Sequence, residues 1–196
     1  MTRPPPGVNS RRRRSPAHTR LAVLSLVVLA LACYVFWKPA AEPDGMRIDI
    51  YKSTRELVLR HADGTTRKFR VGLGPNPVGT KQREGDGATP EGEYFICVKN
   101  PNSRYSLSLG ISYPGPGDAA RGLASAAISE AEHAAILEAH NSGHTPPWKT
   151  ALGGEIFIHG HGSRSDWTAG CIALEDVEMR ELYDLVSIGT PVAIHP

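Results

Sequence analysis

A histidine and a cysteine, each beside a glycine, are the residues of this sequence best suited to chemistry. The short apolar run that starts at Ile156 ends in His159, and Cys171 follows twelve positions later among small residues. A cysteine attacks carbonyl carbon well only as a thiolate, and a nearby imidazole can accept its proton. Gly160 and Gly170 permit close approach of the backbone. The pattern predicts a base, His159, and a nucleophile, Cys171, on two adjoining loops.

The sequence leaves three other interpretations of these residues open. Cys171 can be a small buried side chain, with His159 a hydrogen-bonded core histidine. Cys97 and Cys171 can form a disulfide in an oxidising compartment, which would block the nucleophile. His159, His161 and Cys171 offer three zinc ligands, but no fourth ligand follows at a suitable spacing. We therefore predict no metal and no other cofactor.

The basic residues are concentrated at the N-terminus. The first 20 of the 196 residues contain six of the 22 Lys and Arg residues and no acid, and the remainder has 16 bases against 20 acids. The sequence pI near 8.5 therefore reflects the tail. We predict a basic, disordered cytoplasmic tail at residues 1–20 and no nucleic-acid partner, because the basic patch lies outside the foldable part.

An uncharged apolar segment, Leu21 to Trp37, follows the basic tail. Its 17 residues are at the short end of what spans a bilayer. The preceding arginines should stay in the cytoplasm, so we predict a single-pass signal anchor with all later residues outside. A cleaved signal peptide is the alternative. Cleavage needs a small-x-small site after the apolar run, but in Pro39-Ala40-Ala41 a proline occupies the first of the two small-residue positions. A linker at residues 38–45 and one domain at residues 46–196 complete the organisation.

The patterning after residue 46 predicts a mainly β domain, sandwich-like, with a few peripheral helices. Short alternating or apolar runs separated by turn residues are typical of strands. The capping-box pair Ser129 and Glu132 predicts a helix that continues to His140. A second helix is predicted at 176–186, with Val177 and Leu182 among its inward residues. The predicted strands lie at 47–51, 56–60, 66–73, 93–98 and 190–195.

The segment Gly85 to Tyr94, with sequence GDGATPEGEY, joins two of the predicted strands. Its acids and glycines suggest a calcium loop, but the alternating oxygen ligands and the terminal bidentate Glu are missing at the required spacing. A turn in which Pro90 and Gly92 set the backbone dihedrals is the better interpretation.

Several motifs occur in an order that is more specific than any one of them. Over 47–194, the chain resembles the L,D-transpeptidase (YkuD-type) catalytic domain of bacterial cell-wall enzymes. The motifs that carry this resemblance are Leu57-Val-Leu with Asp63-Gly64, the Gly85–Tyr94 segment, Ser112-Tyr-Pro114, Ile158-His-Gly160 and Thr168-Ala-Gly-Cys-Ile172.

The resemblance implies acyl transfer through a covalent intermediate. Cys171 would attack a meso-diaminopimelate carbonyl of a peptidoglycan stem peptide and release the following D-alanine. The thioester would then pass to a stem amine, to a lipoprotein lysine or to water. His159 would be the base, and the backbone carbonyl of Gly160 would orient its ring. Main-chain N–H groups at Gly170 and Cys171 would stabilise the oxyanion.

Other residues are candidates for contacts with the stem peptide. Trp167, Thr168 and Tyr113 are predicted to bind substrate, although aromatic residues at such positions more often simply pack. Arg104 and Arg164 could bind stem carboxylates, although exposed arginines are usually only solvated.

The chain departs from the family pattern at two positions. Ala169 replaces a histidine that many members have before the Gly-Cys pair, and Ala173 replaces an Arg or Asn. These departures leave the acceptor open, so a hydrolase of the same fold and a non-catalytic wall-binding module are alternatives. The resemblance places the anchor in the bacterial inner membrane and the domain on its periplasmic side.

Overall fold

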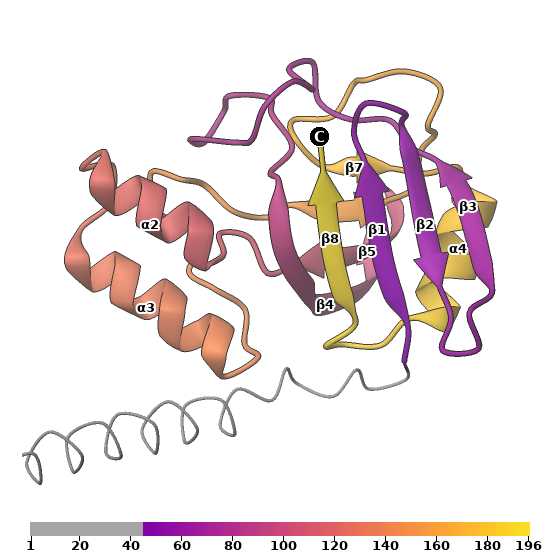
Figure 1. Ribbon diagram of the computed structural model, residues 1–196. Helices are drawn as coiled ribbons and strands as arrows, with labels where there is room; N and C mark the ends of the chain where they lie inside the picture. Colours follow the sequence, from indigo (N-terminus) through magenta and orange to yellow (C-terminus); the bar gives the residue numbers. More distant parts are fainter. Residues whose placement is uncertain (1–44) are drawn as a thin grey trace, which may run out of the picture. The chain divides into compact units, whose positions relative to one another are not determined.

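A computed structural model describes residues 45–196, which form a mainly β domain with three helices (Figure 1). Its eight strands make one sheet in the order β3-β2-β1-β8-β4-β5-β6-β7. The mainly β prediction is confirmed. The strands are β1 (Arg47–Tyr51), β2 (Glu56–Arg60), β3 (Thr66–Arg70), β4 (Gly92–Ser103), β5 (Ser106–Ile111), β6 (Phe157–His159), β7 (Ile172–Ala173) and β8 (Pro191–His195).

The first three strands form an antiparallel meander because local turn signals separate them. The turn between β2 and β3 uses Gly64 at φ +84°, and Asp63 accepts a hydrogen bond of 2.8 Å from the Thr65 N–H. β1 pairs in parallel with β8, so the two ends of the described domain meet in the middle of the sheet. Alternate residues such as Ile48 and Ile50 are fully buried in the core.

The sheet curls, and its two halves take the place of separate sandwich layers. Strand β4 belongs to both halves and carries two register shifts against β5. Gly72, just after β3, forms an isolated antiparallel bridge with Ala173 of β7. This bridge brings the first sheet edge against the last one. The segment after β3 therefore lies next to the residues that follow Cys171.

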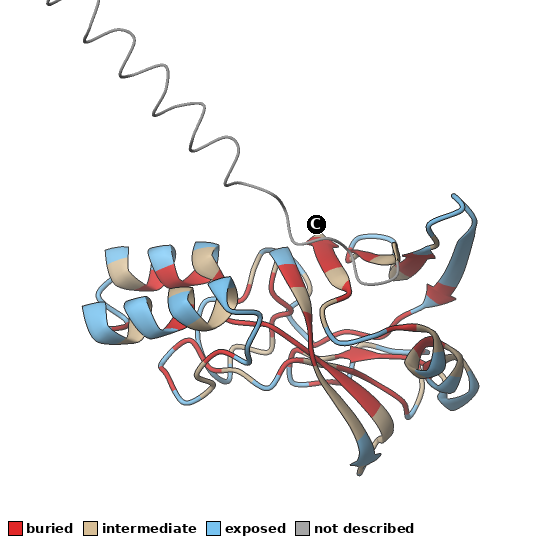
Figure 2. Ribbon diagram, turned by 90° about the horizontal axis from the view of Figure 1, so that it is seen from below, coloured by how far each residue is buried: buried red, intermediate tan, exposed pale blue. Residues whose placement is uncertain are grey.

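Three helices lie outside the sheet: α2 (Pro116–Ala124), α3 (Glu130–Asn141) and α4 (Asp176–Leu185). Helices α2 and α3 pack together beside the sheet and turn their buried residues inward (Figure 2). The predicted capping box is confirmed, because Ser129 Oγ accepts from the Glu132 N–H and Glu132 accepts from the Ser129 N–H. Helix α2 was not predicted.

The predicted inward position of Val177 in α4 is wrong. Met179 and Leu182 are fully buried, and Val186 follows just after the helix with 1% exposure. Val177 precedes Met179 by two positions, which turns it by about 200° around the helix axis. Its side chain accordingly points to solvent, with 80% exposure.

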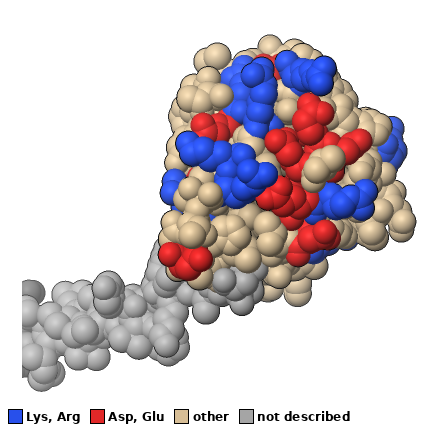
Figure 3. Space-filling model, turned by 90° about the vertical axis from the view of Figure 1, so that its right-hand side faces the viewer, with Lys and Arg blue, Asp and Glu red and all other residues tan. Residues whose placement is uncertain are grey.

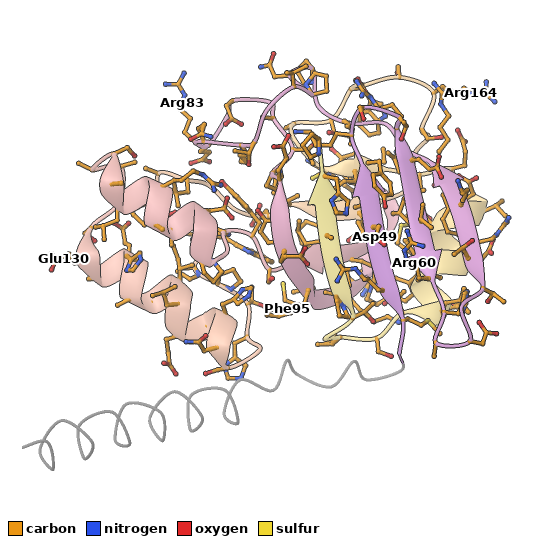
Figure 4. The ribbon with its side chains drawn as sticks, in the orientation of Figure 1. Asp49, Arg60, Arg83, Phe95, Glu130 and Arg164 are labelled. Atoms are coloured by element: carbon orange, nitrogen blue, oxygen red, sulfur yellow. The ribbon has the colours of Figure 1, made fainter. Side chains whose placement is uncertain are left out.

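Ion pairs join several charged side chains of the domain. Asp49 of β1 forms ion pairs with Arg47 and Arg60 (Figure 4). Burial opposes ionisation of Asp49, but hydrogen bonds from the two arginines keep its pKa below the usual value. Acidic and basic side chains interleave on the face shown in Figure 3. This face thus presents alternating charge rather than a single-sign patch.

The predicted tail at 1–20 and anchor at 21–37 lie outside the described residues, as does all but the last residue of the predicted linker at 38–45. Among residues 45–196, no helix has the length and apolar character needed to cross a membrane.

Candidate active site

The structure brings His159 and Cys171 to adjacent strands. His159 is the last residue of β6, and Cys171 immediately precedes β7. These strands pair in parallel, with Ile158 opposite Ile172 and His159 opposite Ala173. Both candidate catalytic side chains line a cleft of about 1510 Å³. Ile158 and Ile172, which lie opposite each other in β6 and β7, are fully buried. Their burial fixes the two strands beside the catalytic candidates.

His159 is held in one tautomer by the backbone. Its Nδ1 lies 2.7 Å from the carbonyl oxygen of Gly160, so Nδ1 carries the proton and Nε2 is left as an acceptor. Tyr105 stacks on the imidazole with ring centroids 4.6 Å apart, and Trp167 meets it edge-on at 5.6 Å. Burial lowers the pKa of His159 below 6.5 despite the opposing effect of the Gly160 hydrogen bond. The imidazole is neutral at neutral pH.

The space at position 160, next to His159, fits only a residue without a Cβ. The Gly160 N–H donates to the Tyr105 carbonyl at 3.0 Å. A Cβ at this position would collide with the carboxylate of Asp176 and lie 2.9 Å from the Tyr105 oxygen. The same Asp176 carboxylate accepts from the His161 N–H at 2.9 Å, so it fixes the backbone beyond the histidine.

The thiol of Cys171 contacts the backbone at the start of β6 and just before it. Its Sγ lies 3.4 Å from the donating N–H of Phe157 and 3.6 Å from the carbonyl oxygen of Glu155. Glu155 holds the left-handed φ of +54°, which is uncommon for a residue with a side chain. Burial raises the pKa of Cys171, with the Phe157 hydrogen bond and the Lys81 charge acting against it. The thiol is therefore protonated at rest.

The loop before β4 forms a wall of the cleft and is organised by Asp86. Its carboxylate accepts from the main-chain N–H groups of Gln82, Arg83 and Ala88 and from the buried ammonium of Lys81. Burial opposes ionisation, but these hydrogen bonds lower the pKa of Asp86 to about 2. Asp86 thus fixes the conformation of this loop through main-chain N–H groups and Lys81.

Thr168 braces the loop that carries Cys171, the candidate nucleophile. Its hydroxyl donates to the Cys171 carbonyl at 2.8 Å and accepts from the Gly170 N–H at 3.2 Å, and its own N–H donates to Leu73 at 3.0 Å. Gly170 has φ +125°, and a Cβ there would lie 2.6 Å from the Ala88 oxygen. The main chain around Cys171 is held by these contacts on both sides.

Comparison with known proteins shows the family to which this chain belongs. The model of the YkuD family, the L,D-transpeptidase catalytic domain, matches residues 45–194. This chain belongs to the L,D-transpeptidase family. A search of curated proteins returned no match.

Two solved structures illustrate what this chain is similar to. A variant of the helical cell shape determining protein Pgp2 from Campylobacter jejuni is 26% identical with a TM-score of 0.52, over 76% of this chain and 46% of that one. An L,D-transpeptidase from Mycobacterium smegmatis is 11% identical with a TM-score of 0.46, over 78% of this chain and 59% of that one. The present chain spans about half the length of the structures that it matches.

The three predicted substrate-binding residues differ in their relation to the cleft of this L,D-transpeptidase domain. Tyr113 is fully buried, and its hydroxyl donates to the Leu152 carbonyl at 2.9 Å, so its prediction as a substrate contact is wrong. Thr168 borders the cleft but is nearly buried and bonded to the loop. Trp167 lines the cleft with 41% exposure, and its Nε1 donates to the Gly162 carbonyl at 3.0 Å.

The structure bears on two of the alternative roles of these residues, the disulfide and the zinc site. Cys97 and Cys171 are both free thiols. Within residues 45–196, no group of three His, Cys, Asp or Glu side chains is placed to hold a metal ion. His161 instead lies edge-on to Tyr105 at 5.5 Å.

The sequence analysis missed the residues that hold the pair from a distance. Tyr105 stacks on His159 but lies 54 positions before it, in a turn that no motif marks. Asp166 forms an ion pair with Arg55 at 2.6 Å and accepts from the Leu73 N–H at 2.9 Å. These bonds anchor the start of the loop that leads to Cys171.

Replacing Thr168 by valine tests whether the brace is needed for reactivity. Valine keeps the size of the side chain but loses both hydrogen bonds, so we expect acylation of Cys171 to slow about 10- to 100-fold as the loop loses its geometry. The rate of adduct formation with a carbapenem, followed by intact-protein mass spectrometry, measures the effect. Thr168→Ser retains the hydroxyl and should react at nearly the original rate. Equal rates for the valine variant and the original chain would contradict the role of the brace.

Proposed function

We propose that this chain is a peptidoglycan L,D-transpeptidase that uses Cys171 as its nucleophile. The observation that carries the proposal is the cleft that His159, at the end of β6, shares with Cys171, immediately before the paired strand β7. Nδ1 of the histidine is bound to the Gly160 carbonyl. The membership of the chain in the family supports a stem peptide as the substrate class.

In the proposed first step, Nε2 of His159 accepts the proton of the Cys171 thiol as Sγ bonds to the carbonyl carbon of the donor peptide. The carbonyl π electrons move to oxygen, and main-chain N–H groups of the nucleophile loop stabilise the charge. The Gly170 N–H is already bonded to Thr168, so it donates to the oxyanion by sharing that contact. Collapse breaks the C–N bond, and the imidazolium protonates the leaving amine.

In the proposed second step, an amine attacks the thioester carbonyl while His159 accepts its proton. The C–S bond breaks, and the thiol is restored by the proton from the imidazolium. Because burial raises the pKa of Cys171 and lowers that of His159, the resting pair is neutral. Proton transfer therefore accompanies attack, and no preformed thiolate–imidazolium pair is required.

A hydrolase of the same fold is the second candidate function. The similarity at 26% identity to a helical cell shape determining protein favours a role in cell shape, which trimming of stem peptides would serve. In this candidate, water replaces the amine in the second step and a free carboxylate is formed. A lipoprotein lysine is a further amine acceptor of the first candidate.

We also propose that the domain works outside the cytoplasm, held at the bacterial inner membrane by the apolar segment at 21–37. The support is the charge pattern of the sequence, with six arginines before that segment. Peptidoglycan stems lie on that side of the membrane, so the proposed location and substrate agree.

Incubating the full-length protein with a tetrapeptide stem, with and without an added amine acceptor, tests the two functions. A transpeptidase gives an acyl-enzyme mapped to Cys171, release of the terminal amino acid and a cross-linked product that depends on the acceptor. A hydrolase gives the shortened stem with a free carboxylate under both conditions. Intact donor with no acyl-enzyme, in a folded protein, would overturn both and support a wall-binding module.

A further inference from the structure

The turn between β4 and β5 consists of two residues, Arg104 and Tyr105. Ser103 pairs with Ser106 across the turn, and the Tyr105 N–H donates to Ser103 Oγ at 3.1 Å. Ser106 takes a left-handed φ of +72°, which is uncommon for a serine. Both turn residues line the cleft that contains His159 and Cys171. The turn thus has a defined conformation at the edge of the site.

The turn is joined directly to the histidine segment. The Tyr105 carbonyl accepts from the Gly160 N–H at 3.0 Å, and the Tyr105 ring stacks on His159 with an interplanar angle of 24°. Ring stacking and the backbone bond together fix the distance between the turn and the imidazole. A side chain on the neighbouring turn residue is therefore held close to the base.

Arg104 places an uncompensated positive charge at this point. Its guanidinium carbon lies 4.8 Å from the centroid of the Tyr105 ring, a cation–π arrangement that restrains the side chain. Among residues 45–196, no carboxylate forms an ion pair with Arg104. The buried cation of the same cleft, Lys81, is paired with Asp86 at 2.8 Å. Lys149 also lines the cleft with no ion pair to a described residue, but only Arg104 lies on the ring that stacks on His159.

The chemistry of the reaction indicates what that ligand is. His159 must protonate the leaving amine, so the leaving amino acid lies on the histidine side of the cleft. The carboxylate of a C-terminal amino acid is separated from its amine nitrogen by a single carbon. The Tyr105 ring contacts both the His159 imidazole and the Arg104 guanidinium, so a single aromatic ring links the base to the cation. A guanidinium binds carboxylates with two parallel hydrogen bonds and so fixes their orientation.

We propose that Arg104 binds the terminal carboxylate of the amino acid that leaves the donor peptide, and that Tyr105 is the platform that holds Arg104 beside His159. This inference rests on the proposed acyl-transfer function. It makes Arg104 a specificity-determining residue that selects donors whose free carboxylate lies one residue beyond the scissile bond.

The test compares two tetrapeptide stems that differ only at the C-terminus, one with a free D-alanine carboxylate and one with a D-alanine amide. Release of D-alanine or of its amide is followed by mass spectrometry, and kcat/KM is obtained for each donor. For the original full-length chain, we expect the free acid to be preferred about 10- to 100-fold, as is typical of charge-assisted hydrogen bonds. For Arg104→Gln, the preference should fall close to one while the amide donor reacts at its original rate.

Arg164→Gln is the matched control, because Arg164 is exposed and does not line the cleft. This variant should keep the full preference for the free acid. An unchanged preference in Arg104→Gln would overturn the inference while leaving the proposed function intact. An equal loss with both donors would also overturn it, because Arg104 would then act through His159 rather than on the carboxylate. If the original chain turned over neither donor, the proposed function would itself fail, and the inference with it.

Discussion

Replacing Cys171 by alanine is expected to abolish formation of a covalent adduct with a carbapenem and with a stem peptide. No other described thiol lines the cleft, so no sulfur there can replace the Sγ of Cys171 as the proposed nucleophile. Loss of a covalent nucleophile typically costs about 10⁴-fold or more in rate. Intact-protein mass spectrometry followed by peptide mapping measures the adduct directly.

Cys97→Ala is the matched control for this experiment. Cys97 is buried, and its Sγ lies 3.5 Å from the Gly110 carbonyl. We expect this variant to form the adduct at the original rate, with at most a modest loss of thermal stability. Thermal unfolding of Cys171→Ala should show that the fold is retained. An adduct that persists in Cys171→Ala, or that disappears in Cys97→Ala, would refute the assignment of the nucleophile.

The parts of the fold that were predicted correctly depend on short-range signals. The capping box of α3 joins Ser129 to Glu132, and the turn at Gly64 separates two strands that are adjacent in sequence. The residues of the pair were also recognisable, because His159 ends an apolar run and Cys171 lies among small residues. Their proximity depends on the parallel pairing of β6 and β7. No local signal specifies that pairing. The order of the family motifs was what supported placing the two residues in one site.

The parts that were missed depend on contacts between distant segments. Tyr105 reaches His159 only because β5 pairs with β6. A tyrosine at this position in the sequence therefore does not by itself predict contact with the histidine. Tyr113 belongs to a family motif but packs in the core, since its hydroxyl finds a backbone partner there. The protonation states of the pair follow from burial, which composition and spacing do not reveal.

Replacing His159 by glutamine is expected to slow acylation of Cys171 by about 10²- to 10⁴-fold near pH 8, the usual contribution of a general base. Glutamine can fill much of the space under Tyr105 but cannot accept the thiol proton. The measurement is the rate of carbapenem acylation, since it isolates the first step. His195→Gln is the control, because His195 stacks on Tyr51 and contacts Asp49 on the outer face of the sheet. This control should react like the original chain.

The pH dependence of the same reaction separates a base from a merely structural histidine. Attack requires the neutral imidazole, and burial lowers the pKa of His159 below 6.5. As the pH falls from 8, the acylation rate should decline at a lower pH than an imidazole of ordinary pKa would give, when His159 becomes protonated. His159→Gln should lack this acidic decline, while His195→Gln should retain it. A rate that falls at the same pH in His159→Gln as in the original chain would show that another group titrates, and His159 would then only pack against Tyr105.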